Sequence, residues 1–144
     1  MEYTVVLVKD ASTGWFVAEV PELPGCVSQG KTKADALENV KDAIQGYLES
    51  LKKHPEEKFL RNKVEIEAKL MKLPIVSGRE VIKALRQIGF EIDHQTGSHV
   101  IMRETAEPFR RATVPNHKVI VPRTLISIIK ESGLTRDEFI KLLK

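Results

Sequence analysis

The stretch SGREVIKALRQIGF, residues 77–90, decides how the second half of the chain folds. Ser77 and Glu80 are spaced as in a capping box, in which each side chain bonds the other residue's backbone N–H at a helix start. The apolar residues that follow recur at helical spacing: Val81, Ile82, Leu85 and Ile88. Gly89 stands where a glycine commonly ends a helix. The stretch therefore predicts an amphipathic helix followed by a strand that begins at Phe90.

Three strand-like segments follow this helix, over residues 90–94, 99–104 and 111–115. After them, apolar residues at helical spacing predict a second helix that ends at Gly133. A short last helix begins at Thr135, where another capping-box pattern occurs. The second half, residues 71–144, is therefore predicted to have the order α-β-β-β-α with a short terminal helix.

The first half, residues 1–70, predicts a different order. Its two β-rich segments, TVVLV and WFVAEV, are joined by the polar turn KDASTG and predict a hairpin. Thr32 and Asp35 open a long amphipathic helix, and the alternating stretch VEIEAKL after it predicts a further strand. We therefore expect an α+β protein of two small domains, 1–70 with the order β-β-α-β and 71–144 with the order given above.

Composition excludes several classes of protein. The chain has 144 residues, of which 42% are hydrophobic and 30% charged, as in a folded globular protein. No apolar run approaches the roughly 20 residues of a membrane span, and no signal peptide is evident. Cys26 is the only cysteine, so an internal disulfide is impossible. We expect a cytoplasmic protein without membrane association.

Charge divides unequally between the halves. Residues 1–70 hold 10 Lys/Arg and 12 Asp/Glu, a net charge of −2, whereas residues 71–144 hold 13 and 8, a net charge of +5. A basic unit is suited to a polyanion such as nucleic acid, and opposite net charges favour contact between the halves. Scattered surface charge without a ligand is the alternative reading of the same numbers.

The segment TGSHVIMRE, residues 96–104, holds the candidate site. Alternate residues of a strand share a face, so His99 and Arg103 point one way and Val100 and Met102 the other. The apolar pair is expected to face the core, which leaves His99 and Arg103 facing solvent or a ligand. A histidine with an ordinary pKa near ~6.5 can act as a general base at neutral pH, or it can be only a polar residue on a wet sheet face.

The neighbours of His99 suit a phosphate. Gly97 would let a phosphate backbone approach closely, and the Ser98 hydroxyl could donate to a phosphate oxygen. His117 is either a structural or phosphate-contacting residue or a second catalytic group. No cluster of His, Cys and carboxylate residues has metal-binding spacing, and no nucleotide-binding loop is present, so no metal or cofactor is expected.

The stretches MKLPIVSGREVIKALRQIGFEI, TGSHVIMR and VPNHKVIVPRTLISIIKESGL closely resemble the HicA family of toxin ribonucleases over nearly all of residues 71–144. The first half, with ELPGCVSQGKTKADALENVKDAI, resembles the HicB antitoxin core. Met71 stands where a free-standing toxin of this family would begin. The chain thus resembles an antitoxin and a toxin joined head to tail in one polypeptide.

This resemblance implies a dsRBD-like fold for the toxin half and a partial RNase-H-like core, without catalytic carboxylates, for the antitoxin half. It implies metal-independent cleavage of mRNA, with His99 as the general base. Because they flank the same sheet and loop, Arg103, Arg111 and Lys118 are the expected RNA contacts, beside Gly97 and Ser98 of the turn. The core lacks the extra DNA-binding segment common in such antitoxins, so DNA binding is doubtful.

Three functional classes remain open from the sequence. In the first, the antitoxin half covers His99 and holds the ribonuclease inactive, either within one chain or by exchange in a symmetric dimer, since the joint of about seven residues, AKLMKLP, is short. In the second, the basic half is a non-catalytic module that binds double-stranded RNA. In the third, the chain is a protein-interaction scaffold.

Overall fold

The computed structural model describes residues 2–55 and 73–143. The first segment supplies β1 (Val6–Lys9), β2 (Phe16–Glu19), β3 (Val27–Gly30) and α1 (Lys33–Lys53). The second segment supplies α2 (Gly78–Arg86), β4 (Phe90–Thr96), β5 (His99–Glu104), β6 (Arg111–Pro115), α3 (Pro122–Glu131) and α4 (Arg136–Leu142). The protein is therefore α+β, as its sequence predicts.

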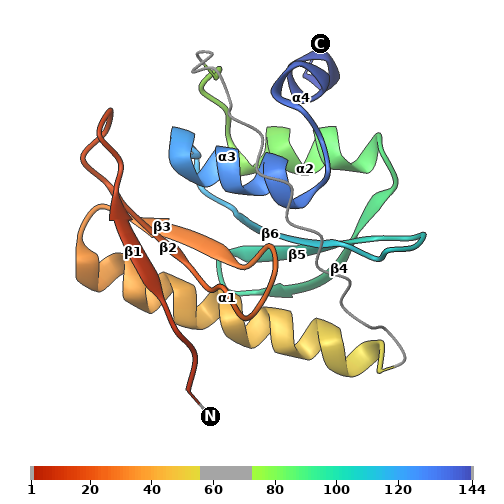
Figure 1. The fold of residues 1–144 in the computed structure, drawn as a ribbon, viewed down its shortest axis with the longest axis horizontal. Helices are drawn as coiled ribbons and strands as arrows, with labels where there is room; N and C mark the ends of the chain where they lie inside the picture. The colour runs from red at the N-terminus through yellow and green to blue at the C-terminus, as the bar shows by residue number, and fades with distance from the viewer. Residues whose placement is uncertain (1, 56–72, 144) are drawn as a thin grey trace.

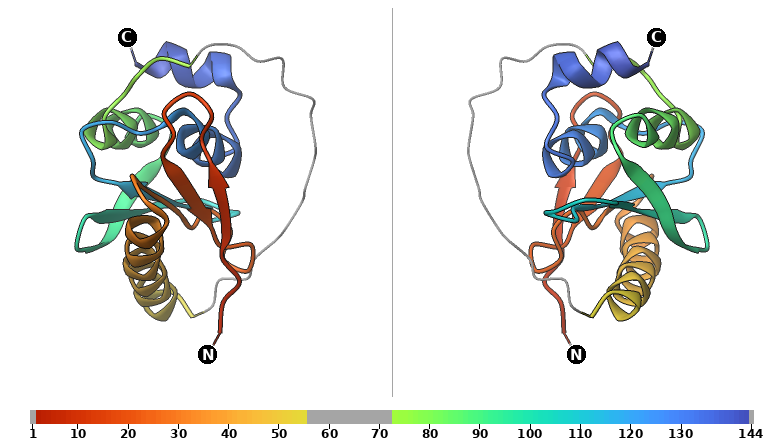
Figure 2. Two further views of the ribbon diagram at one scale, coloured as in Figure 1. Left: turned by 90° about the vertical axis from the view of Figure 1, so that its left-hand side faces the viewer. Right: turned by 90° about the vertical axis from the view of Figure 1, so that its right-hand side faces the viewer.

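Two antiparallel sheets, in the orders β1-β2-β3 and β4-β5-β6, form the middle layer of the molecule. Figure 1 shows α1 below both sheets and α2 and α3 above them. The two perpendicular views in Figure 2 keep the same layers, with the sheets between α1 and the other helices. A single long helix from the first half thus lies against the sheet of the second half.

The predicted order of the second half is confirmed. Ser77 caps α2 in a complete capping box with Glu80, and Thr135 caps α4 in the same way with Glu138. Gly89 has a φ of 96°, a left-handed conformation that favours glycine after a helix. Local signals therefore determine these elements.

The predicted order of the first half is wrong, because it omits β3. The structure has the order β-β-β-α over the residues described, and β3 has the sequence VSQG. Its Ser28 and Gln29 are fully buried. Polar residues next to a glycine look like a loop in the sequence, but these two are buried because the second half supplies their hydrogen-bond partners. The strand predicted at VEIEAKL and the boundary at residues 70 and 71 lie outside the described residues.

The two sheets meet where β3 and β6 run side by side (Figure 1). The backbone N–H of Thr113 donates to the Gly25 carbonyl at 2.9 Å. Its hydroxyl donates to the same carbonyl at 2.8 Å and accepts from the Val27 backbone N–H at 2.7 Å. A side chain at Gly25 would lie 2.0 Å from the Arg111 carbonyl, so this close approach requires glycine.

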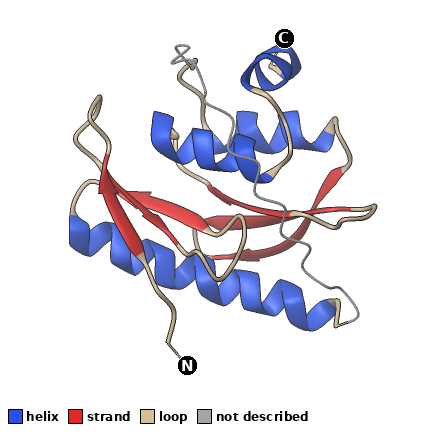
Figure 3. Ribbon diagram, in the orientation of Figure 1, coloured by secondary structure: helices blue, strands red, loops and turns tan. Residues whose placement is uncertain are grey.

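The halves also share a hydrophobic core. Val17 and Val27 of the first half belong to the same buried cluster as the apolar residues of α2, α3 and the second sheet. A second cluster lies on the other side, where Ala18, Val40 and Tyr47 pack between α1 and the first sheet. Figure 3 shows α1 as one uninterrupted helix under both sheets. Over the residues described, no helix combines the length and apolar character that crossing a membrane requires.

Replacing Thr113 by valine should lower the free energy of unfolding by about 1–3 kcal/mol, because the buried Val27 N–H would lose its partner. Thr124→Val is the matched control, since the Thr124 hydroxyl oxygen is buried without a hydrogen-bond partner in the described residues. That change should be neutral or stabilising. Urea unfolding curves of the two variants compare these costs directly, and equal losses would contradict the role given to Thr113.

Candidate functional site

His99 is the first residue of β5 and is completely buried in the intact chain. Its Nε2 atom lies 2.6 Å from the Ser28 hydroxyl oxygen and its Nδ1 atom 3.0 Å from Asp42 Oδ2. Ser28 belongs to β3 and Asp42 to α1, so both partners come from the first half. The candidate base is therefore enclosed by residues far away in the sequence.

The hydrogen bonds define the state of the His99 ring. A carboxylate only accepts, so Nδ1 carries the proton that Asp42 binds, and Nε2 accepts the hydrogen bond of the Ser28 hydroxyl. Burial lowers the pKa of His99 below its ordinary value of 6.5, and Asp42 only partly offsets this effect. The enclosed imidazole is therefore neutral at neutral pH, with Nε2 as a base.

His117 lies beside His99 and contributes a second imidazole. The two ring centroids are 6.4 Å apart in an edge-on arrangement. The Gln29 side-chain amide lies 3.1 Å from His117 Nδ1 and donates to it, which leaves the proton of the neutral ring on Nε2. Burial, and then the charge of His99, lower the pKa of His117. The structure thus brings together the two histidines that the sequence singled out.

The strand parity predicted for His99 is correct, and in the intact chain the first half covers the ring, as expected for the first of the three functional classes. Val100 and Met102 face the core under α2 and α3, and His99 and Ile101 face the other side. In the intact chain this other side is covered by α1 instead of solvent. Gly46 of α1 packs closely against this side, because a Cβ atom there would lie 3.0 Å from the Thr96 hydroxyl oxygen and 3.2 Å from the Ile101 side chain.

The predicted phosphate contacts fall into two groups. Gly97 and Ser98 form the two-residue turn before His99, and Gly97 has a φ of 54°. Arg103 and Arg111 pair at the other end of β5, about 13 Å along the strand from His99 at roughly 3.3 Å per residue. The structure therefore places the turn residues beside His99 and the arginines away from it.

The two arginines and the lysine differ in their surroundings. Arg111 is buried, and its Nε donates to the Ser50 hydroxyl of α1 at 2.9 Å. The Arg103 guanidinium lies over the Phe109 ring, 4.8 Å from its centroid. Lys118 is exposed in the loop after β6. Arg111 is thus enclosed by a residue of the first half, whereas Lys118 faces solvent.

Sequence reasoning missed the residues of α1 that form this site. Asp42, Gly46 and Ser50 recur every four residues and so share one face of the helix. Asp42 contacts His99, Gly46 fits against β5, and Ser50 bonds Arg111. A polar and small stripe beside the apolar stripe is the signal that could have indicated a second binding face.

Ser50 also belongs to a polar cluster at the end of α1. Its hydroxyl donates to Asp93 in β4, and Asp93 Oδ1 lies 2.8 Å from His54 Nε2. Burial raises the pKa of Asp93, but hydrogen bonds from Ser50 and His54 with the nearby positive charges outweigh it and leave the pKa below its ordinary value. The Lys53 ammonium donates to the Asp93 carbonyl. This cluster fastens the far end of α1 to the second sheet.

Gln29 joins β3 to the loop before α3. Its side-chain oxygen accepts from the Val121 N–H at 2.9 Å, and its nitrogen donates to the Val119 carbonyl at 2.8 Å. The same nitrogen bonds His117, as described above. Gln29 thus positions the loop that carries the second histidine.

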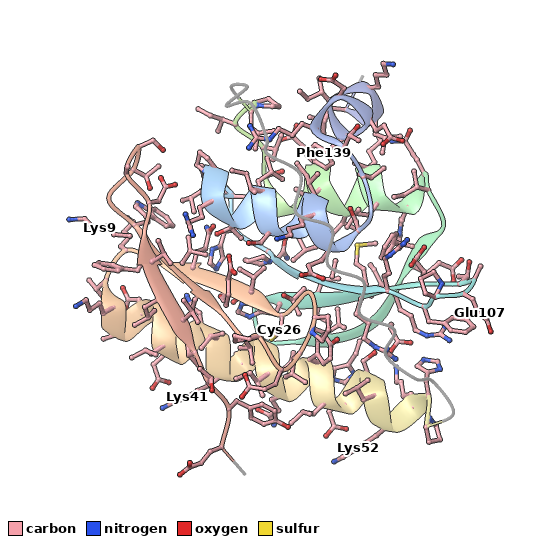
Figure 4. All side chains as sticks on the ribbon, in the orientation of Figure 1. Lys9, Cys26, Lys41, Lys52, Glu107 and Phe139 are labelled. Carbon is pink, nitrogen blue, oxygen red and sulfur yellow. The ribbon has the colours of Figure 1, made fainter. Side chains whose placement is uncertain are left out.

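The part of the chain that the structure describes contains neither a metal-binding cluster nor a reactive thiol. Within residues 2–55 and 73–143, no group of three or more His, Cys, Asp or Glu side chains is arranged to hold a metal ion. Burial raises the pKa of Cys26 to about 12, so its thiol stays protonated. Figure 4 shows Cys26 inside the molecule, between the first sheet and α1.

Comparison with known families agrees with this arrangement. The chain belongs to the HicB_like antitoxins of bacterial toxin–antitoxin systems, whose family model matches residues 3–98. The model of the HicA toxin of bacterial toxin–antitoxin systems matches residues 78–134. Antitoxin and toxin domains are therefore joined in one polypeptide.

Individual relatives resemble only part of the chain. A UPF0150 protein of Thermoplasma acidophilum is 55% identical over 65 residues, which is 45% of this chain and 91% of the relative. A UPF0150 protein of Archaeoglobus fulgidus is 40% identical over 60 residues, 42% of this chain and 86% of the relative. A UPF0150 protein of Helicobacter pylori is 51% identical over 51 residues, which is 35% of this chain and 68% of the relative. No solved structure matches this chain.

Lowering the pH from 7.5 to 5.5 should weaken the folded state through His99. Above about pH 6.5 the group is neutral in both the folded and the unfolded chain. Below it, the unfolded chain takes up a proton that the buried ring, with its lowered pKa, resists. The free energy of unfolding therefore decreases as the pH is lowered.

Urea midpoints at the two pH values measure this loss of stability. His99→Gln should make the decrease in the free energy of unfolding between the two pH values smaller. Part of the decrease should persist, because the pKa of His117 is also lowered. His94→Gln, which alters a histidine outside the site, is the control and should keep the full fall. Identical pH dependence in the unmutated chain and His99→Gln would contradict the assignment.

Proposed function

We propose that the second half is a metal-independent endoribonuclease that cleaves mRNA through His99, and that the first half neutralises it within the same chain. One observation carries this proposal: both ring nitrogens of His99 are bonded by residues of the antitoxin half, and the ring is fully buried. The order α-β-β-β-α of the toxin half supports its dsRBD-like assignment. For the antitoxin half, the partial RNase-H-like assignment remains part of this proposal.

The proposed reaction begins when the site is open to RNA. His99 Nε2 takes the proton of a 2′-hydroxyl, and that oxygen attacks the adjacent phosphorus. The bond from phosphorus to the 5′-oxygen breaks, which gives a 2′,3′-cyclic phosphate and a 5′-hydroxyl. The leaving oxygen must gain a proton, which comes either from water or from His117 in its imidazolium form. The His117 ring lies 6.4 Å from His99, and opening the site would remove the burial that lowers its pKa in the closed chain.

In the closed chain, antitoxin residues occupy the places that substrate groups would take. The Ser28 hydroxyl donates to Nε2, where a 2′-hydroxyl would lie. The Asp42 carboxylate is the anion beside the turn, since a Cβ atom at Gly97 would lie 2.4 Å from it. A hydroxyl and an anion in these positions imitate the ribose and phosphate of RNA. Ser50 also holds Arg111, one of the expected RNA contacts.

A non-catalytic RNA-binding module is the second candidate. The burial of His99 favours it, because a buried polar residue with satisfied hydrogen bonds can be purely structural. The two candidates differ in one result: only the ribonuclease cleaves RNA once the site is opened.

Opening the site should produce cleavage. Asp42→Ala removes the anion next to His99, and Gly46→Arg places a long side chain against Ile101, so the double variant should separate α1 from β5. In the presence of a chelator, this full-length variant should cleave RNA at least tenfold faster than the unmutated chain. Adding His99→Ala should remove about 10²-fold or more of that activity, the usual range for a general base.

The matched control is Glu38→Ala with Gln45→Arg, which makes the same kinds of change on the exposed face of α1. It should leave the chain inactive. Circular dichroism confirms that each variant remains folded. Cleavage that persists without His99, or its absence from every folded variant, would overturn the ribonuclease proposal, and the second result would favour the RNA-binding module.

The chain should be a monomer in solution. A tethered inhibitor acts at an effective concentration near the millimolar range, which favours contact between the halves of one chain. Light scattering after size exclusion should therefore give 16.3 kDa. A mass twice this value would instead support exchange of the halves in a symmetric dimer.

A further inference from the structure

The outer face of α2 carries three basic side chains in a row. Arg79, Lys83 and Arg86 are exposed and follow each other at four and three residues. At 1.5 Å per residue, the row is about 10 Å long. Within the described residues, none of the three forms a salt bridge. Their charges are therefore available to a ligand.

These side chains border a cavity of about 680 Å³ between α2 and β4, which we call the α2 groove. Ile82, Ile92 and Val100 provide its apolar lining, and Gln95 and Asn116 provide polar groups. Among the residues that the structure describes, no carboxylate lines it, and none of its lining residues comes from residues 2–55. Glu91 lines an adjoining smaller hollow with Arg86. The groove thus combines positive charge with hydrogen-bonding amides, and residues 2–55 of the antitoxin half leave it uncovered.

The α2 groove leads toward His99. Gln95 pairs with Val100 in the hairpin, one step before the pair of Thr96 and His99. The Asn116 backbone N–H donates to the Ser98 carbonyl at 2.6 Å, and His117 is the next residue. One end of the groove therefore lies beside the turn and both histidines, although His99 itself faces the other side of the sheet.

We propose that the α2 groove binds the phosphate backbone of RNA and directs the strand to the turn before His99. Arginine and lysine side chains bind phosphates, and side-chain amides bind the 2′-hydroxyls that distinguish RNA from DNA. The role of the strand as substrate rests on the proposed function, whereas binding in the groove does not.

Because residues 2–55 cover His99 but not the groove, we expect the inactive protein to retain RNA affinity. The antitoxin half then blocks the chemical step and leaves binding in place.

Fluorescence anisotropy with a fluorescein-labelled RNA hairpin tests the groove in the full chain. The variant R79Q/K83Q/R86Q should bind at least tenfold more weakly. Its slope of log affinity against log salt should fall in magnitude by about 2, because fewer phosphates are neutralised. The single variant Lys83→Glu, which changes one exposed residue, should weaken binding in the same direction and serves if the triple variant misfolds.

The matched control is K9Q/K41Q/K52Q, which removes the same charge from the antitoxin half. Figure 4 shows these lysines on the outside of β1 and α1, away from α2. The control should bind within about twofold of the unmutated chain. Equal weakening in both triple variants would reduce the effect to net charge and overturn the proposal, as would unchanged binding in the groove variants. Equal competition by a DNA duplex would overturn the assignment to RNA.

The outcome is separable from that of the cleavage experiment. Groove-dependent binding with no cleavage by any opened variant would support the groove and reject the ribonuclease. Cleavage by the opened chain, with unchanged binding in the groove variants, would reject the groove and support the ribonuclease.

Discussion

The burial of a neutral His99 between Ser28 and Asp42 is the interaction on which the rest of the structure depends. A buried imidazole is tolerated only when both nitrogens have partners, and here each partner comes from a different element of the first half. Ser28 can reach the ring only if β3 runs beside β6, and Asp42 only if α1 lies under β5. The hydrogen bonds of one side chain therefore require both the meeting of the sheets and the direction of the long helix.

The same contact explains why α1 has two binding faces. Val40 and Tyr47 pack against the first sheet, whereas Asp42, Gly46 and Ser50 face the second. Small residues allow the helix to approach β5 closely, and the polar ones bond groups that would otherwise be buried without partners. Specific hydrogen bonds, rather than a large apolar surface, thus determine how this face of α1 meets the site.

Elements that depend on local signals were predictable from the sequence. The capping boxes at Ser77 and Thr135 predicted where two helices of the second half begin. The alternation of residues 99–104 predicted which face of the sheet carries His99. By contrast, β3 could not be predicted, because Ser28 and Gln29 are stable in a buried strand only through partners at His99 and Val121. The local sequence pattern also gave no indication that Ser28 and Asp42 are the residues that cover His99. The four-residue spacing of Asp42, Gly46 and Ser50 is the one sequence feature that indicates this second face of α1.

An inhibitor joined to its enzyme is under a different constraint from a separate one. A free antitoxin must offset the entropy lost on association, which favours a large interface over the whole nucleic-acid surface. A tethered one has already lost most of that freedom, so a compact set of bonds to the reacting group is enough. Under the proposed function, the contacts of Ser28, Asp42 and Ser50 are of this kind, because they engage His99 and Arg111 while none of residues 2–55 lines the α2 groove. The proposed inhibition would then act through a few bonds to the reacting group, without contacts from residues 2–55 to the basic face of α2.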